Sequence, residues 1–228
     1  MRLPVCLRIR ALPGARTPCR FWTLYNAADS ETMEWTRFRS TTVRDEADAA
    51  RRLRTPDAEA TALAVIANGG VVLFIRPMAD LGTMAGMRDA AGALHGAWQP
   101  GRHEGFARVG EPGAPVWHEL HTDDFDAAVT FYENVFGRRT EVLGDSPEFR
   151  MSTLGSGPDA LAGIYDATTW PAGASRWVNY FGAADTDAAV RLVCELGGTV
   201  ALDAVDTPFG RMARVADCTG AAFSIMSA

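Results

Sequence analysis

The chain has 228 residues, of which 47% are hydrophobic, so it is long and apolar enough for one large folded domain or two of ordinary size. Its 22 basic and 28 acidic residues give a formal net charge of −6, the opposite of the basic surface that nucleic-acid binding usually requires. No stretch approaches the roughly 18 consecutive apolar residues that span a bilayer. These features exclude a disordered or fibrous chain, and they argue against nucleic acid and membrane as partners.

The cysteines carry a prediction about location. Cys6, Cys19, Cys194 and Cys218 form no CxxC pair, and no histidine stands at metal-ligand spacing from them. We therefore expect reduced thiols in a cytoplasmic protein.

The end of the chain repeats an earlier part of it. Residues 57–98 align without a gap on residues 185–226, a shift of 128 positions that pairs identical residues at twelve places. A second shift, of 61 positions, lays Asp124 on Asp185. The chain therefore consists of units of about 60 residues, which pair into larger halves.

Each unit has the same predicted order of elements. In the third unit, alternation predicts a strand at 116–121, Asp123 or Asp124 can cap a helix, and the helical periodicity of 127–136 ends at Gly137. Further strands are predicted at 140–143, 149–154 and 161–165, and the fourth unit repeats this with a helix at 186–196 and strands at 178–183, 199–202, 211–216 and 222–226. We therefore predict an α+β fold of tandem β-α-β-β-β units, of which the first is incomplete or divergent.

The first half departs from the pattern. Residues 1–53 are too few for a complete unit, and residues 50–56, with adjacent arginines and a proline, make a weak core strand. Divergence, loss of N-terminal sequence and a shifted reading frame upstream of this point all remain open. We predict an atypical and poorly ordered segment at 1–53, the remnant of a first domain at 54–100, a linker at 101–113 and a complete domain at 114–228.

Several motifs of the C-terminal half are typical of one protein family. They are Trp117–Asp124, Ala127-Ala128 with Phe131-Tyr132, Ala162–Ile164, Asp185–Ala189, Leu196–Val200, Phe209–Ala213 and Gly220–Phe223. Over residues 57–228 the chain resembles the vicinal oxygen chelate superfamily of glyoxalase I, bleomycin-resistance proteins and extradiol dioxygenases. It is most similar to the two-domain, hydroxylase-labelled glyoxalase-like proteins of actinobacteria. The resemblance implies that paired units curl their sheets into a cup around a small ligand.

The same resemblance bears on metal binding. Metal-dependent members of the superfamily hold an ion with His, Gln or Glu at four positions of the cup, which correspond here to Trp117, Gly163, Val178 and Ser224. The first three offer no ligand, and a serine hydroxyl is a poor one for the divalent ions concerned. We therefore expect no metal site and no cofactor.

Glu119 and His121 are the candidate catalytic residues. On a strand they share one face with Trp117, while His118 points to the other face and is expected to pack or hydrogen-bond there. A carboxylate beside an imidazole in a partly dry cup can act as a general acid and base. The alternative is that Glu119 pairs with an arginine and His121 lies at a wet rim.

A second set of residues is predicted to bind a ligand. Strand parity places the following side chains on one cavity: Trp117, Val178, Tyr180, Ser224 and Met226. An apolar pocket with aromatic walls suits a flat or aromatic small molecule, and the alternative is that these side chains fill a closed core.

Two hypotheses of function follow. The first is a metal-independent protein of the bleomycin-resistance kind, which binds a small hydrophobic or aromatic molecule in its cup. The second is an enzyme with a lyase or hydroxylase-like tailoring activity that uses Glu119 and His121 as acid and base. Because the first half is incomplete, the chain is expected to act either through its C-terminal half or as a homodimer.

Overall fold

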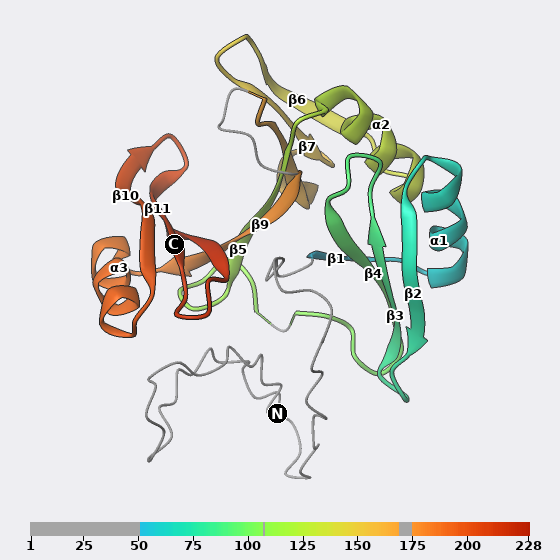
Figure 1. The fold of residues 1–228 in the computed structure, drawn as a ribbon, viewed down its shortest axis with the longest axis horizontal. Coiled ribbons are helices and arrows are strands. Elements are labelled where there is room, and N and C mark those ends of the chain that lie inside the picture. The colour runs from blue at the N-terminus through green and yellow to red at the C-terminus, as the bar shows by residue number, and fades with distance from the viewer. Residues whose placement is uncertain (1–50, 107, 169–174) are drawn as a thin grey trace. The chain divides into compact units, whose positions relative to one another are not determined.

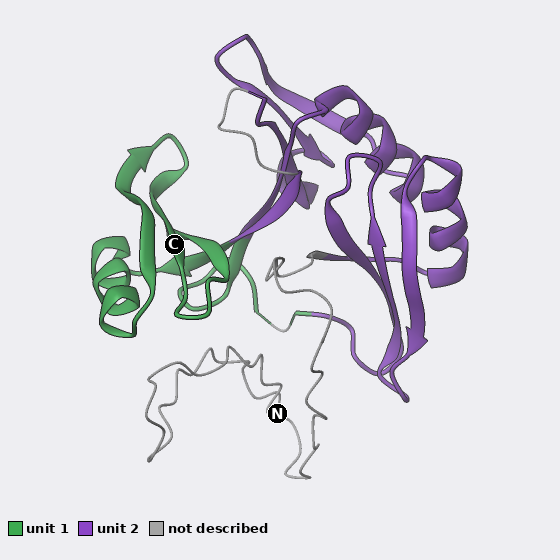
Figure 2. Cartoon of the chain, viewed as in Figure 1, with its two compact units in different colours: residues 1–47, 106–116, 180–228 green, residues 48–105, 117–179 purple. Residues whose placement is uncertain are grey.

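The computed structural model describes residues 51–106, 108–168 and 175–228. The predicted N-terminal segment lies outside the described residues except for its last three positions. The chain splits into two compact structural units, which are distinct from the sequence repeats of about 60 residues and are described separately (Figure 2). Unit 1 includes residues 106–116 and 180–228, and unit 2 includes residues 51–105 and 117–179.

The first part of unit 2 has the full β-α-β-β-β order (Figure 1). Its elements are β1 (Arg51–Arg54), α1 (Ala58–Ala67), β2 (Val71–Pro77), β3 (Gly82–Arg88) and β4 (Leu94–Pro100). They form a four-stranded sheet in the order β1-β4-β3-β2, with β1 parallel to β4. A strand therefore forms where the sequence predicted a weak one. It lies at the edge of the sheet, where Leu53 is buried while Arg52 and Arg54 stay exposed.

The second part of unit 2 repeats this order. Its elements are β5 (Pro115–Thr122), α2 (Phe125–Phe136), β6 (Thr140–Asp145), β7 (Arg150–Leu154) and β8 (Ala162–Asp166), with a short 3₁₀ turn, η1 (Gly157–Asp159), before β8. The strand order is β5-β8-β7-β6, and β5 runs parallel to β8.

Unit 1 contains the fourth repeat. Its elements are β9 (Arg176–Ala183), α3 (Thr186–Glu195), β10 (Thr199–Thr207), β11 (Gly210–Ala216) and β12 (Ala222–Ser227), with the strand order β10-β11-β12-β9. Strands β5 and β9 each begin in one unit and end in the other. The predicted α+β fold of β-α-β-β-β units is confirmed.

Repeated aspartates begin the three α-helices of the described residues. The side chains of Asp57, Asp124 and Asp185 accept hydrogen bonds from backbone N–H groups in the first turns of α1, α2 and α3. These bonds satisfy donors that a helix leaves unpaired at its start. Gly137 ends α2 in the left-handed conformation, at φ 63°, which glycine adopts without strain. The caps predicted for α2 from the sequence are confirmed.

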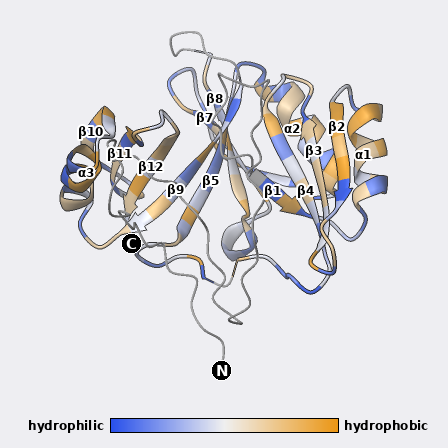
Figure 3. Cartoon of the chain, turned by 60° about the horizontal axis from the view of Figure 1, so that its bottom comes forward, coloured by the Kyte–Doolittle hydropathy of each residue, from blue (hydrophilic) through white to orange (hydrophobic). Residues whose placement is uncertain are grey.

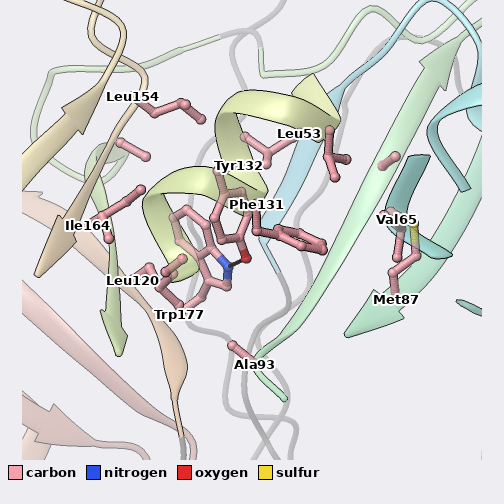
Figure 4. Packing of buried hydrophobic residues seen from close by; sticks show 14 of the residues in the cluster. Leu53, Val65, Met87, Ala93, Leu120, Phe131, Tyr132, Leu154, Ile164 and Trp177 are labelled. Carbon is pink, nitrogen blue, oxygen red and sulfur yellow. Dashed lines mark hydrogen bonds between the residues drawn. The ribbon is translucent and has the colours of Figure 1, made fainter. Parts of the chain in front are cut away.

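A buried network of hydrogen bonds crosses the core of unit 2, and Figure 4 shows one of its bonds, between Trp177 and Tyr132. The hydroxyl of Tyr132 on α2 donates to Asp89 Oδ2 at 2.9 Å and accepts from Trp177 Nε1 at 2.9 Å. Asp89 also accepts the backbone N–H of Ala93 at 2.8 Å. Asp89 is 3% exposed and Tyr132 is fully buried, and burial raises the pKa of both groups. This network of hydrogen bonds joins the β3–β4 turn, α2 and β9.

His95 on β4 is buried beside this network. Its ring contacts the rings of Phe131, Tyr132 and Phe136 at centroid distances of 5.7, 5.5 and 6.2 Å. Nδ1 lies 3.4 Å from the carbonyl oxygen of Ala93, and Nε2 has no hydrogen-bond partner among the described residues. Burial lowers the pKa of His95 to about 4, so the imidazole is neutral near pH 7.

Two further findings concern the cysteines and the helices. Cys194 is a free and exposed thiol, as predicted, and Cys6 and Cys19 lie outside the described residues. Within the described ranges, no helix is long and apolar enough to cross a membrane.

Removing the Tyr132 hydroxyl should destabilise the protein. In Tyr132→Phe, the buried carboxyl of Asp89 and the indole N–H of Trp177 both lose a partner, and we expect a loss of about 2–3 kcal/mol in the free energy of unfolding. Urea denaturation measures it. Thr130→Val is the matched control, because it removes an exposed hydroxyl from the same helix and should cost about 0.5 kcal/mol or less. Equal losses of unfolding free energy in the two variants would contradict a special role for the buried hydrogen-bond network.

His95 should make stability depend on pH. Its pKa is about 4 in the folded protein against 6.5 ordinarily, so its contribution is complete above pH 6.5 and is lost as the pH falls towards 4. The expected loss is about 3 kcal/mol. Asp89 has the opposite effect on stability: because burial raises its pKa, its contribution to the free energy of unfolding grows as the pH falls. Urea midpoints of the wild type and of His95→Leu, measured between pH 7 and 4, separate the two groups: the variant should have the smaller loss, and parallel curves would refute the assignment.

Candidate functional site

The two faces of the β5–β8–β7 sheet differ in character. One face packs Leu120, Ile164 and Leu154 into the core of unit 2, which also contains residues of α2 (Figure 4). In the pairing of β5 with β8, Glu119 lies opposite Gly163 and His121 opposite Tyr165. Because side chains alternate along a strand, Glu119, His121 and Tyr165 lie on the face away from that core. This second face is the candidate site.

Glu119 and His121 form a direct pair. His121 Nε2 lies 2.7 Å from Glu119 Oε1, a distance at which an Nε2–H donates to the carboxylate. The side chains are 2% and 12% exposed, so His121 is buried and the alternative of a wet rim is wrong. A buried imidazole that is held by a carboxylate is equipped to accept and donate a proton.

Neighbouring strands shape the surroundings of this pair. The ring of Tyr165 lies 5.7 Å from that of His121 and 6.1 Å from that of Phe149, measured between centroids. A Cβ atom at Gly163 would lie 2.5 Å from Cε of Met151 and 3.3 Å from Oε2 of Glu119. The glycine therefore makes room for both side chains. The sequence analysis missed Tyr165 and Met151. Tyr165 could have been found, because it stands two positions after Gly163 and strand alternation places these two residues on one face of β8.

The residues at this face do not fit the metal site of the superfamily. A ligand at position 163 would need a side chain where Met151 and Glu119 now lie. Trp117 and Val178, at two further positions, carry no donor atom for a divalent ion. Within residues 51–106, 108–168 and 175–228, no group of three or more His, Cys, Asp or Glu side chains could hold a metal ion.

The other predicted residues are divided between the units. In unit 2, Trp117 and Val178 are half-buried, and His118 Nδ1 lies 2.8 Å from Asn179 Oδ1, as expected for a histidine that hydrogen-bonds on the opposite face from Glu119. In unit 1, Ser224 lies opposite Tyr180 in the register of β12 with β9. Both are buried, and Met226, two positions after Ser224, shares their face. That the two sets line one cavity stays a prediction.

A hollow of about 400 Å³ lies beside the candidate site. It is lined by Asp145, Ser146, Pro147, Glu148, Arg150, Tyr165, Asp166 and Thr168. In its wall, Arg150 donates to Asp126 at 2.7 Å and to Asp145 at 2.9 Å.

The same arginine cluster occurs in unit 1. There, 61 positions later, Arg211 donates to Asp187 at 2.7 Å and to Asp206 at 3.1 Å. These bonds raise the pKa of both Arg150 and Arg211. Arg211 is therefore a structural partner of two carboxylates. Because each arginine ties a helix to a hairpin, the cluster belongs to the fold and is not evidence of a ligand site.

The fold and this face define a class of protein with paired β-α-β-β-β units. Residues 115–225 match the family model of the Glyoxalase/Bleomycin resistance protein/Dioxygenase superfamily. Over these residues, the chain belongs to that superfamily.

The chain is also similar to named proteins and to a solved structure. The chain is 35% identical over 177 residues to the anthracycline biosynthesis protein DauV of Streptomyces sp. (strain C5), and 36% identical over 177 residues to the anthracycline biosynthesis protein DnrV of Streptomyces peucetius. Each match covers 75% of this chain and 62% of the relative, so the chain spans about three fifths of their length. Among solved structures, the 2,3-dioxygenase LapB from Pseudomonas sp. KL28 has a TM-score of 0.53 at 13% identity, covering 78% of this chain and 70% of that one. At this identity the likeness shows the fold alone.

Filling the space at Gly163 should disturb the site. In Gly163→Ala, the new methyl group meets Met151 and Glu119, and we expect a loss of about 1–3 kcal/mol from overpacking. In the background of Met151→Ala, the same substitution should cost less, which a double-mutant cycle by urea denaturation measures. Equal costs in both backgrounds would show that Met151 does not set the constraint.

Proposed function

We propose that this protein binds a small hydrophobic or aromatic molecule, without a metal ion, at the face that carries Glu119 and His121. The proposal rests on one observation above all: a buried carboxylate–imidazole pair lies beside the aromatic ring of Tyr165, where the superfamily's metal ligands have no counterpart. Apolar and aromatic walls with a few polar groups are the usual lining of small-molecule sites. Trp117, Val178, Tyr180, Ser224 and Met226 are proposed as further ligand contacts.

The relatives suggest the chemical class of the ligand. Two of them are named as anthracycline biosynthesis proteins. Anthracyclines are built on fused, planar rings, and such rings stack on aromatic side chains. We therefore propose a planar, fused-ring ligand. A cytoplasmic location stays a prediction.

A second candidate function is an enzyme. It is favoured by the 2.7 Å hydrogen bond between Glu119 and His121, because the carboxylate holds the imidazole ring in one orientation for proton transfer. In this role His121 would take a proton from an acidic O–H or C–H group of the bound molecule and return it at another atom. Glu119 would then be the partner that balances the positive charge.

Binding can be measured with alizarin, a planar dihydroxyanthraquinone, by isothermal titration calorimetry. We expect Trp117→Ala to weaken binding about tenfold, the effect of losing one stacked aromatic ring. Phe209→Ala removes a ring that is 63% exposed in unit 1 and should leave the affinity unchanged. The wild-type affinity should also survive dialysis against EDTA. No measurable binding would oppose the ligand class, and native mass spectrometry that shows a stoichiometric divalent metal would overturn metal independence.

The same probe separates binder from enzyme. A pure binder should leave the absorption spectrum of alizarin unchanged over time, and Glu119→Gln or His121→Ala should alter its affinity little. If the wild type converts alizarin and both variants are slower by about 10²-fold or more, the catalytic reading is favoured.

A further inference from the structure

The sheet of unit 1 carries a row of polar side chains on the face away from α3. Helix α3 lies on one side of the sheet (Figure 3), where Val215 and Ile225 pack with its residues. Because side chains alternate along a strand, Arg214 on β11 and Ser224 on β12 lie on the opposite face. In the register, Arg214 lies opposite Ser224, and Ser224 lies opposite Tyr180 on β9. A guanidinium, a hydroxyl and a phenol therefore form one row across three neighbouring strands.

The hydroxyl in the middle of this row is buried without a partner. Ser224 is fully buried, and its Oγ has no hydrogen-bond partner among the described residues. Tyr180, beside it, is 4% exposed. Burying a hydroxyl without a hydrogen bond costs free energy, so buried polar groups are nearly always paired. An acceptor atom of a bound molecule would provide the partner that Ser224 lacks.

The other two repeats of the described residues have equivalent rows, which serve as internal controls. The rows have the same strand order and register, and they consist of Glu119, Gly163 and Thr153 in one repeat and Arg52, Gly96 and Gly86 in the other. The position of Ser224 is a glycine in both, and neither has an arginine at the position of Arg214. The fold therefore requires neither the buried hydroxyl nor the guanidinium, and these two residues are particular to unit 1.

The surroundings of Arg214 are uncharged. Its neighbours in the register are Ser224 and Leu202, and the next pair along the same face is Met212 opposite Met226. A guanidinium is always charged and only donates hydrogen bonds, and its planar fork matches the two oxygens of a carboxylate. A single positive charge among uncharged neighbours fits a ligand group with a single negative charge. The two methionines offer an adaptable apolar surface next to it.

We propose that Arg214, Ser224 and Tyr180 bind a carboxylate group of the ligand, while its apolar part lies along Met212 and Met226. The guanidinium donates to the two carboxylate oxygens, and the hydroxyl of Ser224 donates to a remaining lone pair. This inference deepens the proposed function, on which it rests for a small ligand with apolar rings. It narrows the ligand to an aromatic acid and makes Arg214 a specificity-determining residue.

Two probes with the same fused rings test the proposal by isothermal titration calorimetry. They are 2-naphthoate and the neutral alcohol 2-naphthalenemethanol. The wild type should bind the carboxylate at least tenfold more tightly than the alcohol, and Arg214→Gln should reduce this preference to about threefold or less. Ser224→Ala should weaken naphthoate binding about fivefold, and it serves if the arginine variant folds poorly. Far-UV circular dichroism and urea midpoints confirm that each variant is folded.

The matched control removes an arginine from the other face of unit 1. Arg191→Gln changes an exposed residue of α3 and should keep the full preference for the carboxylate. Equal wild-type affinities for the two probes, or no binding of either, would overturn the proposal. So would a preference that persists in both Arg214→Gln and Ser224→Ala, or one that is lost equally in the control. Binding of 2-naphthyl phosphate tenfold tighter than naphthoate would refute the assignment to a carboxylate.

The alizarin titration keeps this test separate from that of the proposed function. If alizarin binds and the naphthoate preference is absent, the carboxylate site alone fails. If the preference depends on Arg214 and alizarin does not bind, the carboxylate site stands and the broader ligand class fails.

Discussion

The hydrogen bonds that Tyr132 makes with Asp89 and Trp177 hold unit 2 together. They connect a turn of the first β-α-β-β-β segment, the helix of the second and the strand that follows it. In a buried setting each bond is strengthened by the low dielectric, and each unpaired group would be costly. The packing of Phe131, Phe136 and His95 around the Tyr132 ring depends on the same placement. Helix α2 also covers the core face of the sheet. The placement of α2 therefore determines which face, the one with Glu119 and His121, is left on the opposite side.

Register is the second constraint. Pairing of Glu119 with Gly163 leaves a space that Met151 and the Glu119 side chain occupy, and it brings Tyr165 opposite His121. The glycine that makes room for this arrangement is also the residue that removes a ligand from the superfamily's metal position. Gly163 therefore makes room for the buried acid–base pair and is one of several positions, with Trp117 and Val178, that do not fit a metal ion.

The repeats separate what the fold needs from what this chain has added. Aspartates cap all three described α-helices, and the arginine clusters of Arg150 and Arg211 recur 61 positions apart, so these features belong to the architecture. Individual residues differ, because Leu63 and Ile75 are exposed apolar residues whereas the equivalent positions in unit 1 carry Arg191 and Asp203.

The sequence by itself determined the features that depend on near neighbours along the chain. Helix caps at Asp124 and Gly137, and the shared face of Glu119 and His121, follow from local hydrogen bonds and strand alternation. The sequence predicted only a weak strand at β1. Its arginines are tolerated because β1 lies at the edge of the sheet, and which strand forms an edge depends on pairing with distant strands. Tyr165 and Met151 beside the site, and the burial of His95 among three aromatic rings, were decided by the tertiary structure alone. Those contacts join residues far apart in the chain, and only the register of β5 with β8 and the packing of α2 bring them together.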